Sequence, residues 1–230
     1  MSSRATRDRG DARARPFACS DCDLNELCRL AVLLAHRDGR ERPARGTFRV
    51  LDAGARLFRS GGAAGSVFAV RQGTIKTVHL TEDGHERVIA FHVPGEIIGL
   101  EAFGSRTYRC DAIALEQSVC CELPVPRNVE HLAAVVNLLG TAVVPRLPLT
   151  RGPMRERVTG FLADHAERLR RHGFDGRRFR LAMSRGDIAN LLDTSVETVS
   201  RILQQLHREK AIHVRGSTIE LLTLASGERD

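Results

Sequence analysis

Two short helices with recognisable start signals are the feature of this sequence that most limits its fold. Ser184 and Asp187 have the spacing of an N-cap residue and a first-turn carboxylate, and they predict a short helix that starts at this point. Thr194 or Ser195 then caps a second helix, which runs to about Lys210. Two helices joined by such a short turn are typical of a helix-turn-helix.

Two short strands are expected after the second helix. Apolar residues alternate over 212–214 and again over 218–222, with Gly216 in the turn between them. Helix, turn, helix and hairpin, in this order, are the elements of a winged helix-turn-helix. The pattern therefore predicts a winged helix-turn-helix in the C-terminal segment.

The second of these helices has two chemically different faces. Its apolar side chains cluster on one side, and Glu197, Ser200 and Arg201 lie on the other. An arginine fork bonds the acceptors of a guanine, a glutamate accepts from a cytosine amine, and a serine approaches a base or sugar closely. Val196 lies at the edge of this face and suits a thymine methyl group. The alternative interpretation is a solvated face with an incidental Glu197–Arg201 ion pair.

The charge distribution favours a polyanionic partner at the C-terminal end. Of the formal net charge of +7, the segment 177–215 holds eight basic and four acidic residues, while the segment 16–150 holds fifteen of each. Three residues at the helix starts, Arg185, Thr194 and Ser195, are placed to contact DNA phosphates. An arginine-biased composition without a nucleic-acid partner is the competing explanation.

The middle of the chain has the pattern of an antiparallel sheet structure. Short apolar runs such as 67–70, 74–80 and 88–92 are separated by glycine-containing turns at regular intervals. This pattern predicts an antiparallel barrel or sandwich. Helical periodicity then returns from Asn128 to about Val144, and again from Met154 to Arg171.

Six cysteines suggest a metal or redox site. Cys19, Cys22 and Cys28 lie within ten residues, and the others are Cys110, Cys120 and Cys121. The chain is too large, and lacks the apolar segment of a secretory signal, for a disulfide-stapled miniprotein. Thiolates at this spacing suit either a four-thiolate zinc or an iron–sulfur cluster, and the spacing alone does not choose between them.

Several classes of protein are disfavoured. No apolar stretch approaches the roughly 20 residues of a membrane span, and with no signal sequence the expected compartment is the cytoplasm. The cysteines are accompanied by no catalytic triad and no paired carboxylates, and the nine histidines are scattered. A thiol oxidoreductase needs a thioredoxin-like pattern around Cys19 and Cys22, which is not visible. We therefore expect a protein that is not an enzyme.

Taken together, these motifs make the chain similar to FNR-type oxygen-sensing regulators of the CRP/FNR superfamily. The similarity extends over roughly residues 17–222. Its motifs are Cys19–Cys28, Arg71–Lys76, Phe91–Gly95, Val119–Pro124, Arg178–Ala189 and Val196–Arg201. Within the last of them, the family's base-reading residues fall on Glu197, Ser200 and Arg201.

The resemblance implies an α+β fold with three folded parts. A cyclic-nucleotide-binding-like β-roll of antiparallel strands forms the sensory domain, a connecting helix mediates dimerisation, and a winged helix-turn-helix binds DNA. The predicted segments are a mobile basic tail (1–18), which is polar and without periodicity, the cluster loop and β-roll (19–126), the dimerisation helix and linker (127–150) and the DNA-binding domain (151–230). The segment 127–150 is shorter than in the family, so its dimerisation role is the weakest part of the resemblance.

The resemblance also implies a cofactor and partners. The cofactor is an oxygen-labile 4Fe-4S cluster on Cys19, Cys22, Cys28 and Cys121. The implied homodimer binds a double-stranded DNA inverted repeat with TTGAT-like half-sites when oxygen is absent, and oxygen degrades the cluster and releases the DNA. The turn Thr81–Glu86 falls where the family presents a hairpin to RNA polymerase.

Two other kinds of regulator on the same fold stay open. One uses zinc or thiol–disulfide chemistry in place of an iron–sulfur cluster. The other binds a small-molecule effector, such as a cyclic nucleotide. A cyclic-nucleotide site needs a hydroxyl residue after its phosphate-binding arginine, whereas Arg109 is followed by Cys110 here.

Overall fold

The computed structural model describes residues 15–18, 36–37, 40–41, 45–100, 107–124 and 152–223. The cluster cysteines Cys19, Cys22 and Cys28 and the expected dimerisation segment 127–150 lie outside these residues. None of the described helices is long and apolar enough to cross a membrane.

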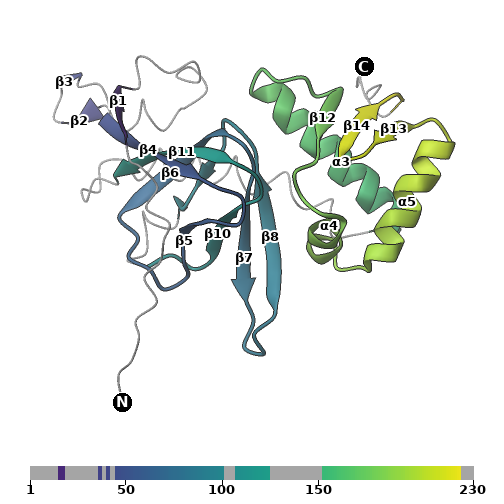
Figure 1. The fold of residues 1–230 in the computed structure, drawn as a ribbon, viewed down its shortest axis with the longest axis horizontal. Helices are drawn as coiled ribbons and strands as arrows, with labels where there is room; N and C mark the ends of the chain where they lie inside the picture. Colours follow the sequence, from purple (N-terminus) through teal and green to yellow (C-terminus); the bar gives the residue numbers. More distant parts are fainter. Residues whose placement is uncertain are drawn as a thin grey trace.

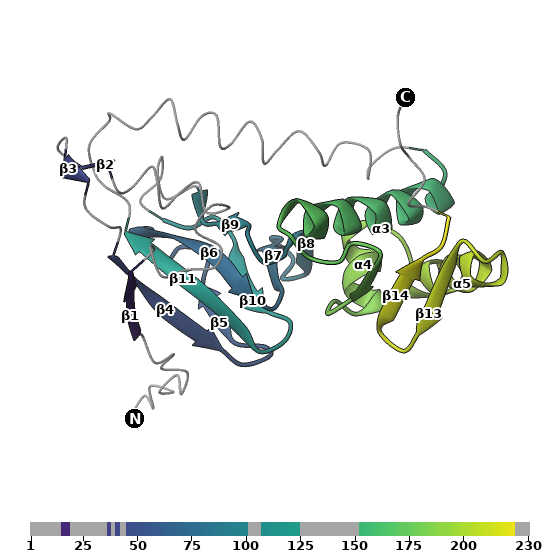
Figure 2. The same cartoon turned by 90° about the horizontal axis from the view of Figure 1, so that it is seen from above.

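The N-terminal half consists of two antiparallel sheets that enclose a core (Figures 1 and 2). The first sheet has the order β1–β4–β11–β6–β9, with β1 (Arg15–Ala18), β4 (Arg45–Leu51), β11 (Ser118–Pro124), β6 (Ser66–Gln72) and β9 (Ile97–Ile98). The second has the order β5–β10–β7–β8, with β5 (Arg56–Phe58), β10 (Asp111–Ala114), β7 (Ile75–Leu80) and β8 (Glu86–His92). The expected antiparallel strands over 67–70, 74–80 and 88–92 are confirmed.

Aromatic side chains fill much of the space between the two sheets. The ring of Tyr108 stacks on that of Phe58 with 3.9 Å between centroids, and Phe68 lies 5.7 Å from Phe58. The Tyr108 hydroxyl donates to the carbonyl of Ser66 at 2.6 Å, so its polar end is satisfied inside the core. These contacts make the roll a packed scaffold on which surface residues are fixed.

One part of the expected tail is a strand. Residues Arg15–Ala18, which sequence analysis assigns to the mobile tail, form β1 and pair with β4 at the edge of the first sheet. Pro16 argues against a strand in the sequence because proline has no N–H to donate to a neighbouring strand. An edge strand tolerates the missing N–H. Next along the chain, β2 (His36–Arg37) and β3 (Arg40–Glu41) pair with each other.

The C-terminal part contains three helices and a small sheet. The elements are α3 (Met154–Arg171), β12 (Arg178–Arg180), α4 (Arg185–Leu191), α5 (Val196–Arg208), β13 (Ile212–Arg215) and β14 (Thr218–Leu221), and the sheet order is β12–β14–β13. The three helices expected between Met154 and Lys210 and the β13–β14 hairpin are confirmed. The third strand, β12, is not anticipated, because three residues are too short to show a period.

The two halves share an apolar core, and the β-roll has a second core of its own. Val88 and Phe91 of the β7–β8 hairpin are buried in the same cluster as Phe161 of α3 and Ile188 and Leu192 around α4. The rings of Phe91 and Phe161 meet edge to face at 6.0 Å. Figure 1 shows α4 lying beside β8, on the side of the second sheet that faces the helices. The shared core sets the position of the helix-turn-helix relative to the β-roll.

Candidate DNA-reading surface and cysteine site

A reciprocal cap fixes the start of α4. The Ser184 hydroxyl oxygen accepts from the Asp187 N–H at 3.0 Å, and the Asp187 carboxylate accepts from the Ser184 N–H at 3.1 Å and from its hydroxyl at 2.7 Å. This arrangement satisfies two helix-end donors at once and confirms the start signal in the sequence.

A tight turn joins α4 to α5. Asp193 has a φ of 50°, a left-handed conformation that aspartate tolerates better than most residues. The Thr194 N–H donates to the carbonyl of Ala189 at 2.9 Å and closes the turn. Ser195, rather than Thr194, is the N-cap of α5, and its hydroxyl oxygen accepts from the Thr198 N–H at 3.2 Å. The direction of α5 is therefore fixed by local hydrogen bonds.

The two faces of α5 differ as expected. Val199, Ile202, Leu203 and Leu206 are buried on its inner face. On the outer face Glu197 and Arg201 are exposed, Ser200 is half-buried, and Val196 is 44% exposed although it is apolar. The structure thus brings together on one accessible surface the four residues to which sequence analysis assigns base reading.

Glu197 is held in its charged form. A hydrogen bond from its own backbone N–H, together with one from Ser195, lowers the pKa of Glu197 below its usual value. An ionised carboxylate is an acceptor only. At neutral pH this side chain is therefore suited to accept from a cytosine amine and to repel acceptor edges of other bases.

The three predicted phosphate contacts differ in their surroundings. Arg185 is half-buried, and its Nη1 atom is buried without a hydrogen-bond partner in the described part of the chain. Ser195 uses its hydroxyl to cap α5, so its contribution is to orient the helix-start N–H groups. Thr194 closes the turn through its backbone.

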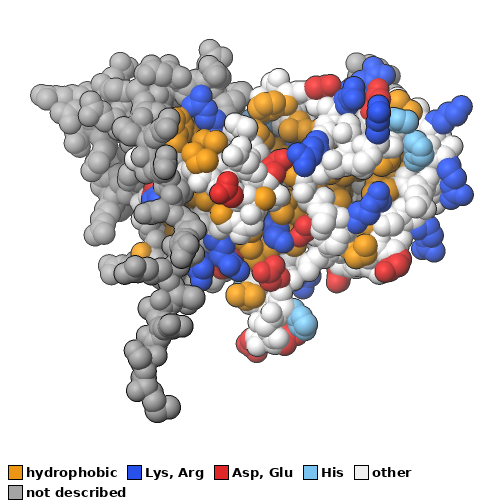
Figure 3. Space-filling model, in the orientation of Figure 1, with side chains coloured by type: hydrophobic (Ala, Val, Ile, Leu, Met, Phe, Trp, Pro, Cys, Tyr) orange, Lys and Arg blue, Asp and Glu red, His pale blue; other side chains and the backbone are white. Residues whose placement is uncertain are grey.

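Basic residues of the small sheet extend the positive surface, and sequence analysis did not single them out. Arg178 and Arg180 of β12 and Arg215 of β13 are exposed. Figure 3 shows lysine and arginine side chains gathered on the right-hand side of the molecule, where Figure 1 places α5 and the wing strands. In the sequence, arginines on both sides of Phe179 could have indicated a basic strand face. They suit phosphate contacts beside the groove that α5 would enter.

Cys120 and Cys121 point to opposite faces of β11. Cys120 is fully buried in the core of the β-roll, and this burial raises the pKa of its thiol to about 12. Cys121 has the opposite orientation, pairs with Phe48 of β4 and Ala69 of β6, and is 6% exposed. Cys120 is enclosed by side chains of the β-roll core, whereas Cys121 faces away from them, so Cys121 is the better candidate for a metal ligand.

A carboxylate next to Cys121 ties three strands together. Glu122 of β11 accepts from the Nε of Arg49 at 2.6 Å and from the hydroxyl of Thr47 at 3.3 Å, both on β4. It also accepts from the hydroxyl of Ser66, on β6, at 3.1 Å. These bonds hold Cys121 in a rigid part of the sheet.

The first sheet also brings the chain close to the N-terminal cysteines. Residue Ala18, at the end of β1, pairs with Arg45 of β4, and Phe48 on the same strand pairs with Cys121. Ordinary strand spacing then puts the Cα atoms of Ala18 and Cys121 about 14 Å apart. Cys19 follows Ala18 directly. Among the described residues no three His, Cys, Asp or Glu side chains are arranged to hold a metal, and three of the four expected ligands lie outside them.

The other expected sites can also be placed. Arg109 is exposed, and Cys110 is half-buried against the core of the β-roll.

The turn between β7 and β8 is closed by hydrogen bonds from the Thr81 N–H to the carbonyl of His85 at 3.0 Å and from the Gly84 N–H to the carbonyl of Thr81 at 2.9 Å. Its tip, from Glu82 to Glu86, is exposed and projects from the body of the protein (Figure 1).

Comparisons with known proteins agree with this architecture. Residues 48–132 match the cyclic nucleotide-binding domain family and residues 156–226 match the Crp-like helix-turn-helix domain family. The chain is 36% identical over 236 residues to the transcriptional activator protein Anr of Pseudomonas aeruginosa, covering 94% of this chain and 96% of the relative. It is 31% identical over 215 residues to the fumarate and nitrate reduction regulatory protein of Escherichia coli, covering 88% and 86%.

A solved structure supports the same assignment. FixK2 from Bradyrhizobium japonicum superimposes with a TM-score of 0.68 at 26% identity, over 80% of this chain and 98% of that one. The expected α+β fold, with a β-roll and a winged helix-turn-helix, is confirmed, and relatives that regulate transcription confirm that the chain is not an enzyme. By these similarities, the protein belongs to the CRP/FNR superfamily of transcriptional regulators.

Proposed function

We propose that the protein is an oxygen-responsive regulator whose sensor is a 4Fe-4S cluster on Cys19, Cys22, Cys28 and Cys121. The placement of Cys121 carries the proposal. This thiol lies on the face of β11 away from the core, in the same sheet as the strand that ends one residue before Cys19. The intervening distance of about 14 Å is one that the following residues can close, at roughly 3.3 Å per residue.

The donor chemistry fits this cofactor. Four thiolates are the usual ligands of a 4Fe-4S cluster, and a buried ligand beside apolar groups limits access of water. When bound, the cluster supplies an oxygen-labile connection between the N-terminal loop and β11. Cys121 then anchors that loop, and Glu122 holds its strand against β4 and β6. Gain or loss of the anchor therefore acts directly on the first sheet.

On the DNA side, the residues of α5 fit one base pair of the proposed half-site. A TTGAT-like half-site contains a single G·C pair. Arg201 suits the acceptors of its guanine and the ionised Glu197 suits the amine of its cytosine. We propose that a homodimer, formed through the segment 127–150, presents two such helices to an inverted repeat in the cytoplasm. The β7–β8 tip, Thr81–Glu86, is the proposed contact for RNA polymerase.

Purification without oxygen tests the sensor. We expect brown protein with about four iron and four sulfide per chain and a broad absorption shoulder that bleaches when air is admitted. Operator binding should weaken in parallel with the bleaching. Colourless protein that contains zinc and binds its operator equally well with and without air would support the zinc alternative and exclude the cluster.

Replacing Arg201 with alanine tests the base-reading assignment. We expect a loss of about 1–3 kcal/mol in operator binding and a relaxed preference at the guanine of each half-site, because the bidentate contact is removed. Arg215→Ala is the charge-matched control, and it should weaken binding to all sequences alike. Affinities for operators with each base at that position measure both effects. A sequence-independent loss in Arg201→Ala would reassign this arginine to phosphate.

A further inference from the structure

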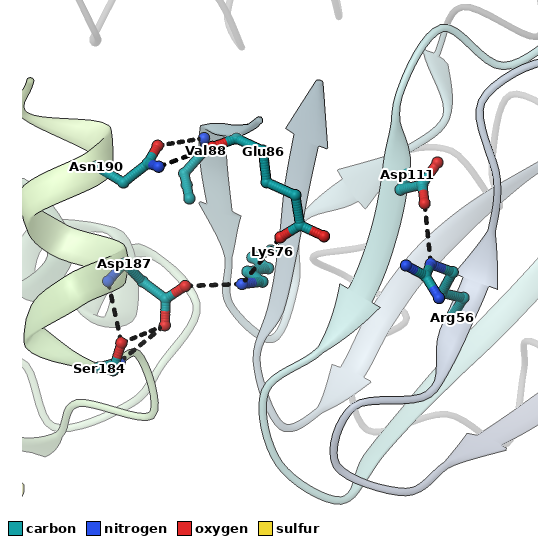
Figure 4. A network of polar contacts seen from close by, with 8 residues as sticks. All are labelled: Arg56, Lys76, Glu86, Val88, Asp111, Ser184, Asp187 and Asn190. Carbon is teal, nitrogen blue, oxygen red and sulfur yellow. Dashed lines mark hydrogen bonds and ion pairs between the residues drawn. The ribbon is translucent and has the colours of Figure 1, made fainter. Parts of the chain in front are cut away.

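The amide side chain of Asn190, on α4, connects the helix-turn-helix to the edge of the β-roll. Its Nδ2 donates to the carbonyl of Glu86 at 2.8 Å, and its Oδ1 accepts from the N–H of Val88 at 2.7 Å (Figure 4). The strand β8 is the edge of its sheet, so this carbonyl and N–H are the groups that a further strand would use. A carboxamide carries a donor and an acceptor side by side, as a peptide group does. Asn190 therefore occupies the place of a neighbouring strand.

A second bond joins α4 to the other strand of the same hairpin. The Nζ of Lys76, on β7, lies 2.7 Å from the Oδ1 of Asp187, and both side chains are only 16% exposed. The same carboxylate caps α4 through Ser184, so the cap and the contact with the β-roll share one group. The Lys76 ammonium also lies 3.9 Å from Glu86, at the base of the hairpin tip. Figure 4 shows the two contacts one above the other, between α4 and the β7–β8 hairpin.

Apolar packing reinforces these polar contacts. Val88 is 5% exposed and belongs to the core cluster that also contains Ile188 and Leu192. On the same strand, Ile89 points outward and is 46% exposed. The hairpin is thus held by α4 at Glu86 and Val88, while residues 82–85 extend beyond this contact into solvent.

We propose that Asn190 is a positioning residue: it fixes the exposed β7–β8 tip relative to the DNA-reading helix, so that operator binding and presentation of the tip to RNA polymerase are coupled. The part that concerns the polymerase rests on the function proposed above. The structural part rests only on the two hydrogen bonds to β8 and on the Lys76–Asp187 pair. Because Asn190 lies on α4 and away from the base-reading face of α5, its replacement should separate DNA affinity from hairpin order.

Two substitutions at position 190 test the coupling in the full-length protein. Asn190→Ala removes both bonds, and Asn190→Asp keeps the size and the acceptor but places a carboxylate against the Glu86 carbonyl. We expect hydrogen exchange in the segment 81–90 to become at least about five-fold faster in both variants. Affinity for the operator should stay within about three-fold of the parent protein. Gln205→Ala is the control: it removes a side-chain hydrogen bond to Glu209 inside the DNA-binding domain and should leave the exchange in segment 81–90 unchanged.

A binding assay with RNA polymerase tests the consequence. At saturating operator occupancy, the Asn190 variants should recruit at least about five-fold less polymerase than the parent or Gln205→Ala. Unchanged hairpin exchange in both variants would overturn the positioning role. Faster exchange with undiminished recruitment would overturn the coupling to polymerase. If the parent protein itself recruits no polymerase, the proposed function fails on that point, and the exchange measurement still decides whether Asn190 orders the hairpin.

Discussion

Replacing Cys121 with serine is expected to abolish iron binding by protein prepared without oxygen, whereas replacing Cys120 or Cys110 should leave iron binding intact. An alcohol ionises far less readily than a thiol and is a poor ligand for iron, so one of the four proposed ligands is lost. Iron and sulfide content should fall from about four per chain to below about one. Cys19, Cys22 and Cys28 should each give the same result.

Cys120 and Cys110 provide the matched controls. The Cys120 side chain lies in the core, where burial raises its pKa to about 12, and Cys110 packs half-buried against the same core. Cys120→Ala and Cys110→Ser should therefore retain full iron, although the first will lose some stability because a buried side chain becomes smaller. Full iron in Cys121→Ser combined with loss in Cys120→Ala would reverse the choice of ligand.

Replacing Glu96 with glutamine is expected to destabilise the protein by about 3–5 kcal/mol, because it removes the carboxylate that forms a bidentate pair with a buried arginine. Arg168 of α3 donates to both carboxylate oxygens of Glu96 at 2.6 Å, and the two side chains are only 13% and 17% exposed. The same guanidinium donates to the carbonyl of Phe91 and to Asp164. This pair joins α3 to the turn between β8 and β9, so its loss loosens the contact between the two halves.

An exposed pair on the same helix is the control. Glu167 contacts Arg170 and Arg171, but these side chains are 42–57% exposed. Glu167→Gln should therefore cost less than about 1 kcal/mol. Denaturant unfolding of both variants at neutral pH gives the comparison. Equal losses in the two variants would mean that burial of the Glu96–Arg168 pair contributes nothing.

The same pair predicts the response to acid. Burial alone would raise the pKa of Glu96, but the hydrogen bond and charge of Arg168 lower it to about 2. A carboxyl group with a lower pKa in the folded state stabilises the fold at neutral pH, and this stabilisation is lost as the pH falls from about 4.5 towards 2. Glu96→Gln should lack this part of the acid response. His165, whose pKa burial lowers to about 4, adds a loss between pH 6.5 and 4 in the parent protein, and this loss extends to lower pH in Glu96→Gln because the Glu96 charge, which raises the pKa of His165, is removed.

The sequence predicted those parts of the protein that depend on neighbouring residues. The start of α4 follows from Ser184 and Asp187, which bond each other three residues apart. The two faces of α5 follow from its helical period. The third strand of the wing and β1 were missed, because each is held by pairing with distant strands rather than by its own pattern.

The orientation of Cys120 and Cys121 is only partly predictable from neighbouring residues. The period of two in a strand requires Cys120 and Cys121 to point in opposite directions. Only the packing of the two sheets decides which face is the core, and hence that Cys120 and not Cys121 packs among the core side chains. The resemblance in the sequence had indicated Cys121, and the structure supplies a physical reason for this choice.

The helix-turn-helix, the exposed polar face of α5 and the antiparallel β-roll follow from the sequence alone, because caps, turns and hydrophobic periods are encoded within a few residues. How these parts are joined depends instead on contacts between residues far apart in the chain. Asn190 and Val88 are 102 residues apart, and Arg168 and Glu96 are 72 apart. No local pattern marks such pairs, since their bonds form only after the shared core has brought α3 and α4 against the β7–β8 hairpin.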